Sequence, residues 1–181
     1  MKFSPSIAAF GLAAALALPG QAFADPELNI PNFSHLRGKA VDSVDVTLDG
    51  FLLRVARKFA QSDAEDPESV AAAEFLQGIK SVRVRNFTFD EDGAYSKADV
   101  DSVRKQLSNP GWSPLVQVHR TSPKEDVDVY VNMEGEKVMG LAVIASEARE
   151  FTIVNIVGSF DIDKIGRLEG QFGIPQLSQN Q

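Results

Sequence analysis

The feature that most constrains the fold is a series of four apolar segments that follow one another in the second half of the chain. They span residues 115–119, 127–133, 138–145 and 151–157, and short polar connections separate them. Connections of this length join neighbouring strands that run in opposite directions, so the series predicts an antiparallel meander. The last two segments are apolar at nearly every position. This pattern predicts central strands covered on both faces, with Val154 and Ile156 in the core.

Two further strands and several helices accompany this meander. Strands are predicted over 43–48 and 79–89, and helices over 51–61, about 66–78, 96–107 and about 162–173. The resulting order, β-α-α-β-α-β-β-β-β-α, predicts one α+β domain. We expect a two-layer sandwich, in which helices pack on one face of a mainly antiparallel sheet of about six strands.

The predicted helices have recognisable ends and faces. Asp49 and Asp66 are suited to cap the first two helices, and the pair Ser96 and Asp99 resembles a capping box. The helix over 51–61 has its apolar residues on one face, as expected of a helix that packs on a sheet. These residues are Leu52, Val55, Ala56 and Phe59.

The strand over 79–89 changes the phase of its apolar residues. Val82 and Val84 share one parity, whereas Phe87 and Phe89 share the other. Because side chains alternate between the two faces of a strand, one inserted residue would bring all four to the same face. The sequence therefore predicts a β-bulge near Arg85 and Asn86.

The N-terminus has the pattern of a cleavable secretory signal, residues 1–24. Lys2 precedes an uncharged stretch from 7 to 18, which is too short to span a bilayer, and Ala22 and Ala24 provide the small residues of a cleavage site. Cleavage is expected between Ala24 and Asp25, which places the mature chain in the periplasm or the medium. We expect an extended segment over 25–42, a single domain over 43–173 and a flexible tail over 174–181.

Charge and cysteine content exclude several classes of partner. Loss of Lys2 with the signal leaves 17 basic and 25 acidic residues, a balance that opposes nucleic-acid binding. The chain has no cysteine, so the fold is predicted to be stable without disulfides, and no lipid anchor on cysteine is expected. No later stretch is long and apolar enough to predict a membrane span.

No motif predicts a metal site, a cofactor or a catalytic nucleophile. The only two histidines, His35 and His119, lie in different segments, which argues against a zinc site. The acidic stretch 90–93 lacks the spaced ligands of a calcium loop and is interpreted as a solvated turn. A Ser-His-Asp arrangement through His119 stays open, because such triads assemble from distant residues.

The polar residues of the strands provide the candidate site. If the valines of these strands face the helices, the polar residues between them face away; these are Arg83, Arg85, Gln117, His119, Asp128, Tyr130 and Asn132. Arg83 and Arg85 would repel one another unless a carboxylate or an anionic ligand lay between them. We therefore assign Arg83, Arg85, His119 and Tyr130 to a site for an unknown protein or a small anionic ligand. The alternative is a solvated face with cross-strand ion pairs.

Several packing motifs together resemble one family. They are LRVARKF at 53–59, IKSVRVR at 79–85, GWSPLV at 111–116 and VNIVG at 154–158. In this order they resemble the DUF4252 family of small exported bacterial proteins, over about Val44 to Leu168. The resemblance implies export and a single domain, and it implies no catalytic residue. Many members carry a lipid anchor, from which this cysteine-free chain departs.

Three functions are compatible with these patterns. The first is an exported non-enzymatic binding or regulatory module of the bacterial cell envelope. The second is a hydrolase of unrecognised type that uses His119. The third is a self-associating structural module, which the apolar strands favour if the chain itself leaves the second sheet face uncovered.

Overall fold

The fold is described here from a computed structural model, in residues 25–60, 70, 73, 76–122 and 124–160. The predicted signal over 1–24, the predicted helix over 162–173 and the predicted tail lie outside this range. So does most of the predicted helix over 66–78, of which residues 70, 73 and 76–78 are described as helical.

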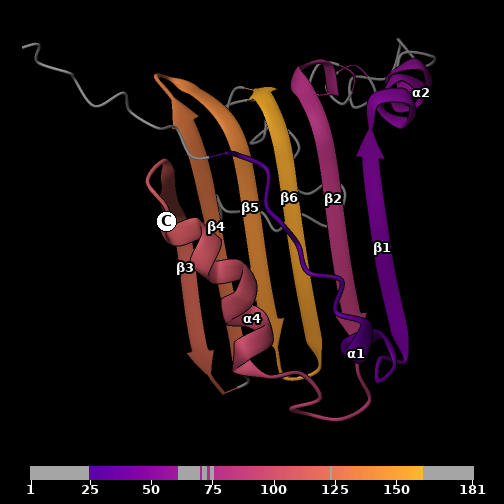
Figure 1. The fold of residues 1–181 in the computed structure, drawn as a ribbon, viewed down its shortest axis with the longest axis vertical. Coiled ribbons are helices and arrows are strands. Elements are labelled where there is room, and N and C mark those ends of the chain that lie inside the picture. The colour runs from indigo at the N-terminus through magenta and orange to yellow at the C-terminus, as the bar shows by residue number, and fades with distance from the viewer. Residues whose placement is uncertain (1–24, 61–69, 71–72, 74–75, 123, 161–181) are drawn as a thin grey trace, which may run out of the picture.

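Six strands form a single antiparallel sheet (Figure 1). They are β1 (Asp42–Asp49), β2 (Ile79–Thr88), β3 (Trp112–Thr121), β4 (Lys124–Glu134), β5 (Lys137–Glu147) and β6 (Glu150–Phe160), in the spatial order β1-β2-β6-β5-β4-β3. The described helices are α1 (Ser34–Arg37), α2 (Gly50–Ala60), α4 (Lys97–Arg104) and the 3-10 helix η1 (Lys105–Ser108). The α+β class, the antiparallel sheet and the four-strand meander are thus confirmed.

The strand β2 keeps its phase through Arg85 and Asn86. Arg85 pairs with Ile153 and Asn86 with Thr152 without interruption, and the register shift lies between Ile79 and Ser81 instead. The predicted bulge near Arg85 is therefore wrong. A bulge is unnecessary because both faces of β2 are packed: Phe87 lies in the main core on one side, and Val82 packs against a second apolar cluster on the other.

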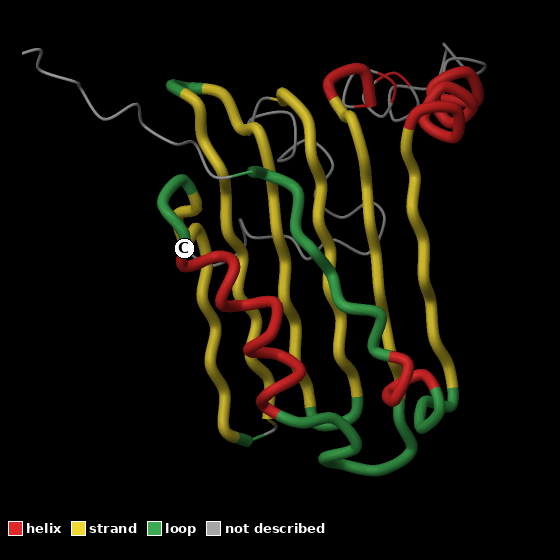
Figure 2. Tube along the Cα trace, in the orientation of Figure 1, coloured by secondary structure: helices red, strands yellow, loops and turns green. Residues whose placement is uncertain are grey.

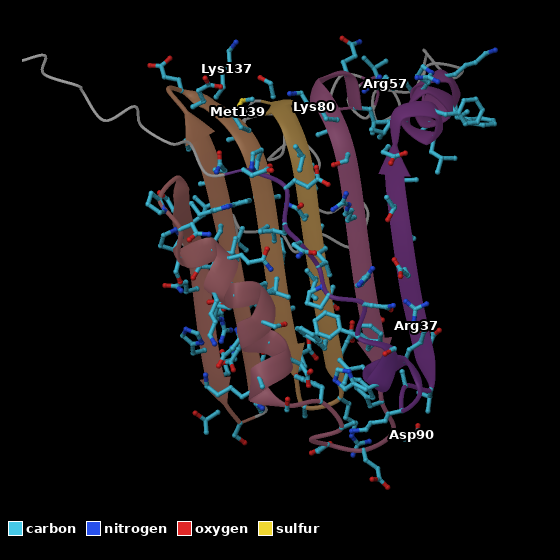
Figure 3. The ribbon with its side chains drawn as sticks, in the orientation of Figure 1. Arg37, Arg57, Lys80, Asp90, Lys137 and Met139 are labelled. Atoms are coloured by element: carbon cyan, nitrogen blue, oxygen red, sulfur yellow. The ribbon has the colours of Figure 1, made fainter. Side chains whose placement is uncertain are left out.

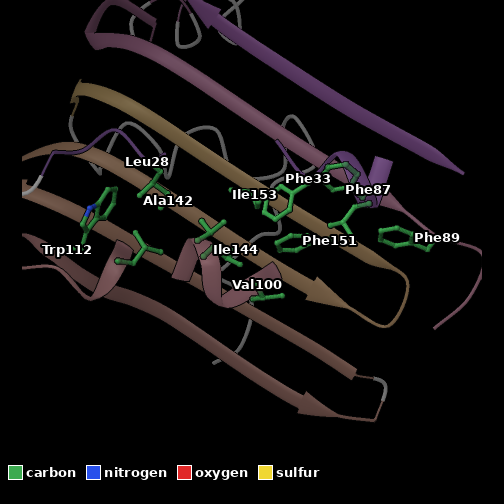
Figure 4. Packing of buried hydrophobic residues seen from close by; sticks show 13 residues of the cluster. Leu28, Phe33, Phe87, Phe89, Val100, Trp112, Ala142, Ile144, Phe151 and Ile153 are labelled. Carbon is green, nitrogen blue, oxygen red and sulfur yellow. The ribbon is translucent and has the colours of Figure 1, made fainter. Parts of the chain in front are cut away.

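One sheet face lies under the N-terminal segment and α4. Residues 25–40, here called the N-terminal strap, cross this face diagonally, and α4 lies over its β3–β5 side (Figures 1 and 2). We call it the strapped face. The main core is buried between these layers (Figure 4) and comprises Leu28, Phe33, Leu36, Phe87, Phe89, Val100, Val103, Leu107, Trp112, Ala142, Ile144, Phe151 and Ile153. The segment predicted as a plain extended leader therefore contributes three core residues.

The opposite face is apolar along its middle and carries a polar cluster, Asn86, Thr152 and Glu150, where β2 ends and β6 begins. One row of directly paired residues consists of six valines, one from each strand: Val46, Val84, Val154, Val143, Val129 and Val116. Paired residues in antiparallel strands point to the same side, so this valine row marks what we call the valine face. Leu53 of α2 packs against one end of it, in a second cluster with Ile79, Val131 and Val138.

These two faces reverse the predicted orientation of the sheet. The polar strand residues lie on the face that the strap and α4 cover, and Asp128 and Asn132 are 1% and 4% exposed. Val154 and Ile156 are only half-buried, whereas Phe151 and Ile153 of the same strand are fully buried. The described helices do not all lie on one face, because α2 contacts the valine face.

Candidate binding surfaces

Arg83 and Arg85 hold the strap against the sheet. Arg83 donates to the carbonyl oxygen of Leu28 at 3.3 Å and pairs with the carboxylate of Glu27. Arg85 donates to the carbonyl oxygens of Ile30 and Pro31. Both guanidiniums thus bind a segment of their own chain, and the predicted repulsion between them is offset by local acceptors.

Asp45 of β1 completes this arrangement. The Arg85 Nε lies 3.4 Å from its carboxylate, and Arg37 of α1 donates to the same oxygen at 2.8 Å. Burial alone would raise the pKa of Asp45, but the hydrogen bond from Arg37 and the charge of Arg85 outweigh it and hold that pKa below its ordinary value. The carboxylate that balances Arg85 is therefore Asp45.

Two amides complete the attachment of the strap. Asn155, which is 1% exposed, accepts from the Leu28 amide at 3.0 Å and donates to the Pro26 carbonyl at 3.1 Å. Gln106 of η1 forms a reciprocal pair with the backbone of Asn29, with both distances 2.9 Å. The strap carries little regular structure, so Asn155 satisfies backbone groups that would otherwise be left unpaired against the sheet, and Gln106 adds a contact at the surface.

A methyl group at Gly140 should loosen the strap. A Cβ built on Gly140 would lie 2.7 Å from the Pro26 Cβ and 3.1 Å from the Trp112 ring. We expect Gly140→Ala to lower the free energy of unfolding by about 1–3 kcal/mol in urea melts, because a packed interface must shift. The control is Gly38→Ala, whose Cβ would come no closer than 3.9 Å to other atoms. Equal stability of the two variants would show that the strap does not pack tightly at Gly140.

Asp128 pairs with α4. The Arg104 Nη2 lies 2.5 Å from an oxygen of Asp128, and Gln117 donates to the other oxygen at 3.2 Å. The same Gln117 amide lies 3.4 Å from the hydroxyl of Tyr130, which packs beside the main core. Tyr130 is therefore part of the contact between α4 and the sheet.

His119 lies at the far edge of the sheet from the two arginines. It is on β3, whereas Arg83 and Arg85 are on β2, and three strands separate β3 from β2. Its Nδ1 is 3.0 Å from Asp126.

Ser146 faces Asp126 from the other side, in the row His119, Asp126, Ser146. A catalytic triad needs the histidine between the serine and the carboxylate, and here the carboxylate lies between them. The four residues predicted as one site are not brought together.

The outward side of α2 presents large apolar side chains. Phe51, Leu52 and Phe59 are 66%, 47% and 74% exposed, and with half-buried Val55 they form what we call the α2 stripe. The Arg54 guanidinium lies over the Phe51 ring, 5.8 Å from its centre. Figure 3 shows α2, which includes Arg57, at the same end of the molecule as Lys80. Lys58, also exposed, adds another cation beside the stripe.

The side of α2 opposite the stripe holds the helix against the sheet. Leu53 is 1% exposed in the second cluster, and Arg57 donates to the carbonyl oxygens of Leu76 and Ile79 at 2.9 and 2.6 Å. Sequence reasoning assigned Leu52 and Phe59 to the core-facing side, and the structure places both outside. The amphipathic pattern was detectable, but the pattern alone does not tell which side meets the sheet.

Among residues 25–60, 76–122 and 124–160, and the two isolated positions 70 and 73, no three histidine, cysteine or acidic side chains are grouped to hold a metal ion. No helix in the described part of the chain is long and apolar enough to cross a bilayer.

Comparison with known families gives one match. The family described as "Domain of unknown function (DUF4252)" matches residues 37–168. The chain belongs to the DUF4252 family. The DUF4252 match begins at the end of α1, includes all six strands and continues eight residues beyond β6. It thus contains the α2 stripe and the valine row. No curated protein and no solved structure matches the chain significantly.

Proposed function

We propose that the protein is an exported non-enzymatic binding module of the bacterial cell envelope that binds a protein partner through the α2 stripe. The exposure of Phe51, Leu52 and Phe59 carries this proposal. Contiguous apolar side chains on a soluble protein are typical of interaction sites, and aromatic residues are frequent binding anchors. Export is supported by the signal pattern of residues 1–24.

The chemistry of the stripe indicates the kind of partner. A fixed helix with aromatic residues at i and i+8 and a half-buried valine at i+4 suits an apolar groove. Arg54 and Lys58 lie beside the stripe, so carboxylates at the rim of that groove would complement it. The acidic balance of the whole chain favours a protein groove over an anionic bilayer.

This proposal moves the binding surface away from the strand residues first assigned to it. Arg83 and Arg85 are bound to the strap, and His119 and Tyr130 lie in separate contacts. Removal of Arg83 and Arg85 would release the strap and so would not test partner binding cleanly. The α2 stripe can be altered without touching those contacts.

Site-specific photo-crosslinking in living cells, followed by binding with purified proteins, tests the proposal. A photoreactive residue at Leu52 should give one discrete adduct, and the control position Leu115, an exposed apolar residue on β3, should not. With the partner identified and purified, the double variant Phe51→Ala, Phe59→Ala should weaken binding at least tenfold, because anchors of this kind dominate interface energies. Its melting temperature should stay close to wild type.

Three outcomes would contradict the proposal. Adducts that are the same from Leu52 and Leu115 would show nonspecific capture. Unchanged affinity of the Phe51→Ala, Phe59→Ala variant for the purified partner would place the interface elsewhere. Adducts to lipid, together with sedimentation of the purified protein on anionic phospholipid vesicles, would replace the protein partner with a bilayer surface.

A further inference from the structure

The two outer strands of the described sheet, β1 and β3, differ in how well they are protected against pairing with another chain. They lie at opposite edges (Figure 1). β3 contains Pro114, which has no amide hydrogen to donate, and its pairing with β4 shifts between Pro114 and Val116. Proline and bulges at an edge oppose the addition of a strand. β1 has neither feature, because its eight residues include no proline and pair with β2 without interruption.

β1 also presents apolar side chains at its edge. Val44 and Val46 are 41% and 37% exposed, and both lie on the valine face. Ser43, Asp45 and Thr47 alternate with them on the strapped face. In the described part of the chain β1 pairs with β2 alone. A regular edge strand with exposed valines is suited to accept a further strand through its main-chain groups.

We infer that β1 pairs in antiparallel fashion with β1 of a second copy, about a two-fold axis at Val46. The side chains of facing residues set the register of such a pair. With Val46 opposite Val46, Val44 lies opposite Leu48 and Asp45 lies opposite Thr47. The apolar residues of both strands then share the valine face, and Ser43 faces Asp49, so no two carboxylates lie opposite one another.

Neighbouring registers fit less well. An axis at Asp45 would place the two Asp45 carboxylates opposite one another, and an axis at Thr47 would place Asp45 opposite Asp49 of the second copy. Like charges directly opposite destabilise a strand pair. In the register centred on Val46, Asp45 keeps its own cations, Arg37 and Arg85. Its charge therefore does not oppose the approach of a second chain.

The pairing would give a dimer with two α2 helices on the same side of one continuous sheet. α2 begins at Gly50, directly after β1, and contacts β1 and β2 of its own chain. Gly50 lies opposite Asp42 of the second copy, so the two Gly50 residues are roughly 27 Å apart at ~3.4 Å per residue. A dimer thus presents two α2 stripes to a partner. This consequence rests on the proposed function, whereas the pairing of β1 does not.

Sedimentation velocity of the purified mature chain tests the inference. The wild-type chain should sediment as a dimer, and Val46→Lys should raise the dissociation constant of the dimer at least about tenfold, because the two-fold axis brings the two lysines opposite one another. The control is Leu115→Lys, the same kind of change at a residue of the other edge strand that is 51% exposed, and it should leave the dimer unchanged. Both variants should melt close to wild type.

A cysteine at the axis reports the register, since the native chain has none. Val46→Cys should give a disulfide-linked dimer under mild oxidation, because facing Cβ atoms lie about 4.5–5.5 Å apart, close to the span of a disulfide. Ser43→Cys, also exposed on β1, should give no such dimer. It lies opposite Asp49 of the second copy, and so about 20 Å from the second Ser43.

Each of four results would overturn the inference. They are a wild-type chain that is monomeric at its highest soluble concentration, equal dissociation of Leu115→Lys and Val46→Lys, equal linkage through Ser43→Cys and Val46→Cys, and dissociation of the dimer by Phe51→Ala, Phe59→Ala. The last would place the contact on the α2 stripe. That double variant should stay dimeric while it loses the partner of the stripe, and monomeric Val46→Lys should still bind that partner. Failure of the dimer is thereby distinguished from failure of the proposed function.

Discussion

Replacement of Phe151 by alanine is expected to lower the free energy of unfolding by about 3–5 kcal/mol. Phe151 is fully buried on β6, and its ring lies 5.2 Å from the ring of Tyr95 and 5.7 Å from that of Phe33. Phe151 and these two neighbours come from three separate segments, so the cavity cannot collapse by the movement of one element. Denaturant melts followed by circular dichroism measure the change.

Phe51→Ala provides a matched control, because it removes the same side chain from an exposed position. With 66% of Phe51 exposed, its loss should change the free energy of unfolding by no more than about 0.5 kcal/mol. A similar loss of stability in the two variants would contradict the assignment of Phe51 to the surface and of Phe151 to the core.

The second large effect is expected for Arg104→Met, which leaves the carboxylate of Asp128 buried without its cation. Breaking such a pair from one side destabilises proteins by about 3–5 kcal/mol, and partial exposure of Arg104 places the expected loss near the lower limit. Chemical denaturation of the purified variant gives the value. Gln117 still donates to Asp128 but carries no charge.

Removing both charges should restore much of the stability. The double variant Arg104→Met, Asp128→Leu replaces the pair with apolar groups, and such replacements are often neutral. Lys97→Met, which removes a cation from the exposed pair with Asp101, should be nearly silent. A double variant as unstable as the single one would show that Arg104 acts through packing of its side chain, and not through the buried charge of Asp128.

Local sequence signals predicted the helices and strands well, because capping and tight turns depend on residues that are neighbours in sequence. The meander followed from short connections, which allow little except hairpins. The capping box is confirmed, since Ser96 accepts from the Asp99 amide and Asp99 accepts from the Ser96 amide. The pairing of β2 with β6 had no such signal, because the two strands are far apart in sequence.

The orientation of the sheet was predicted wrongly because both of its faces are rich in apolar residues. Alternation separates the two faces of a strand but does not identify which one receives the helices. The polar residues of the strapped face depend on partners from other elements: Arg83 on Glu27, and Asp128 on Arg104. The strap escaped detection because Leu28, Phe33 and Leu36 have no regular spacing, and each fits its own site on the sheet.

The repetition of valine along the strands of the valine face has a consequence for how these strands find their alignment. Where valines succeed one another on this face, a slip by two residues would exchange Val82 for Val84 or Val127 for Val129 and leave those positions apolar. Hydrophobic burial on that side therefore discriminates poorly between the native alignment and its nearest competitors. The discrimination comes from polar contacts. On the valine face Asn86 of β2 donates to Thr152 and Glu150 of β6, and on the strapped face a two-residue slip would carry Asn155 away from the Pro26 and Leu28 backbone groups it binds. On this sheet the valines provide cohesion and the polar residues select one alignment.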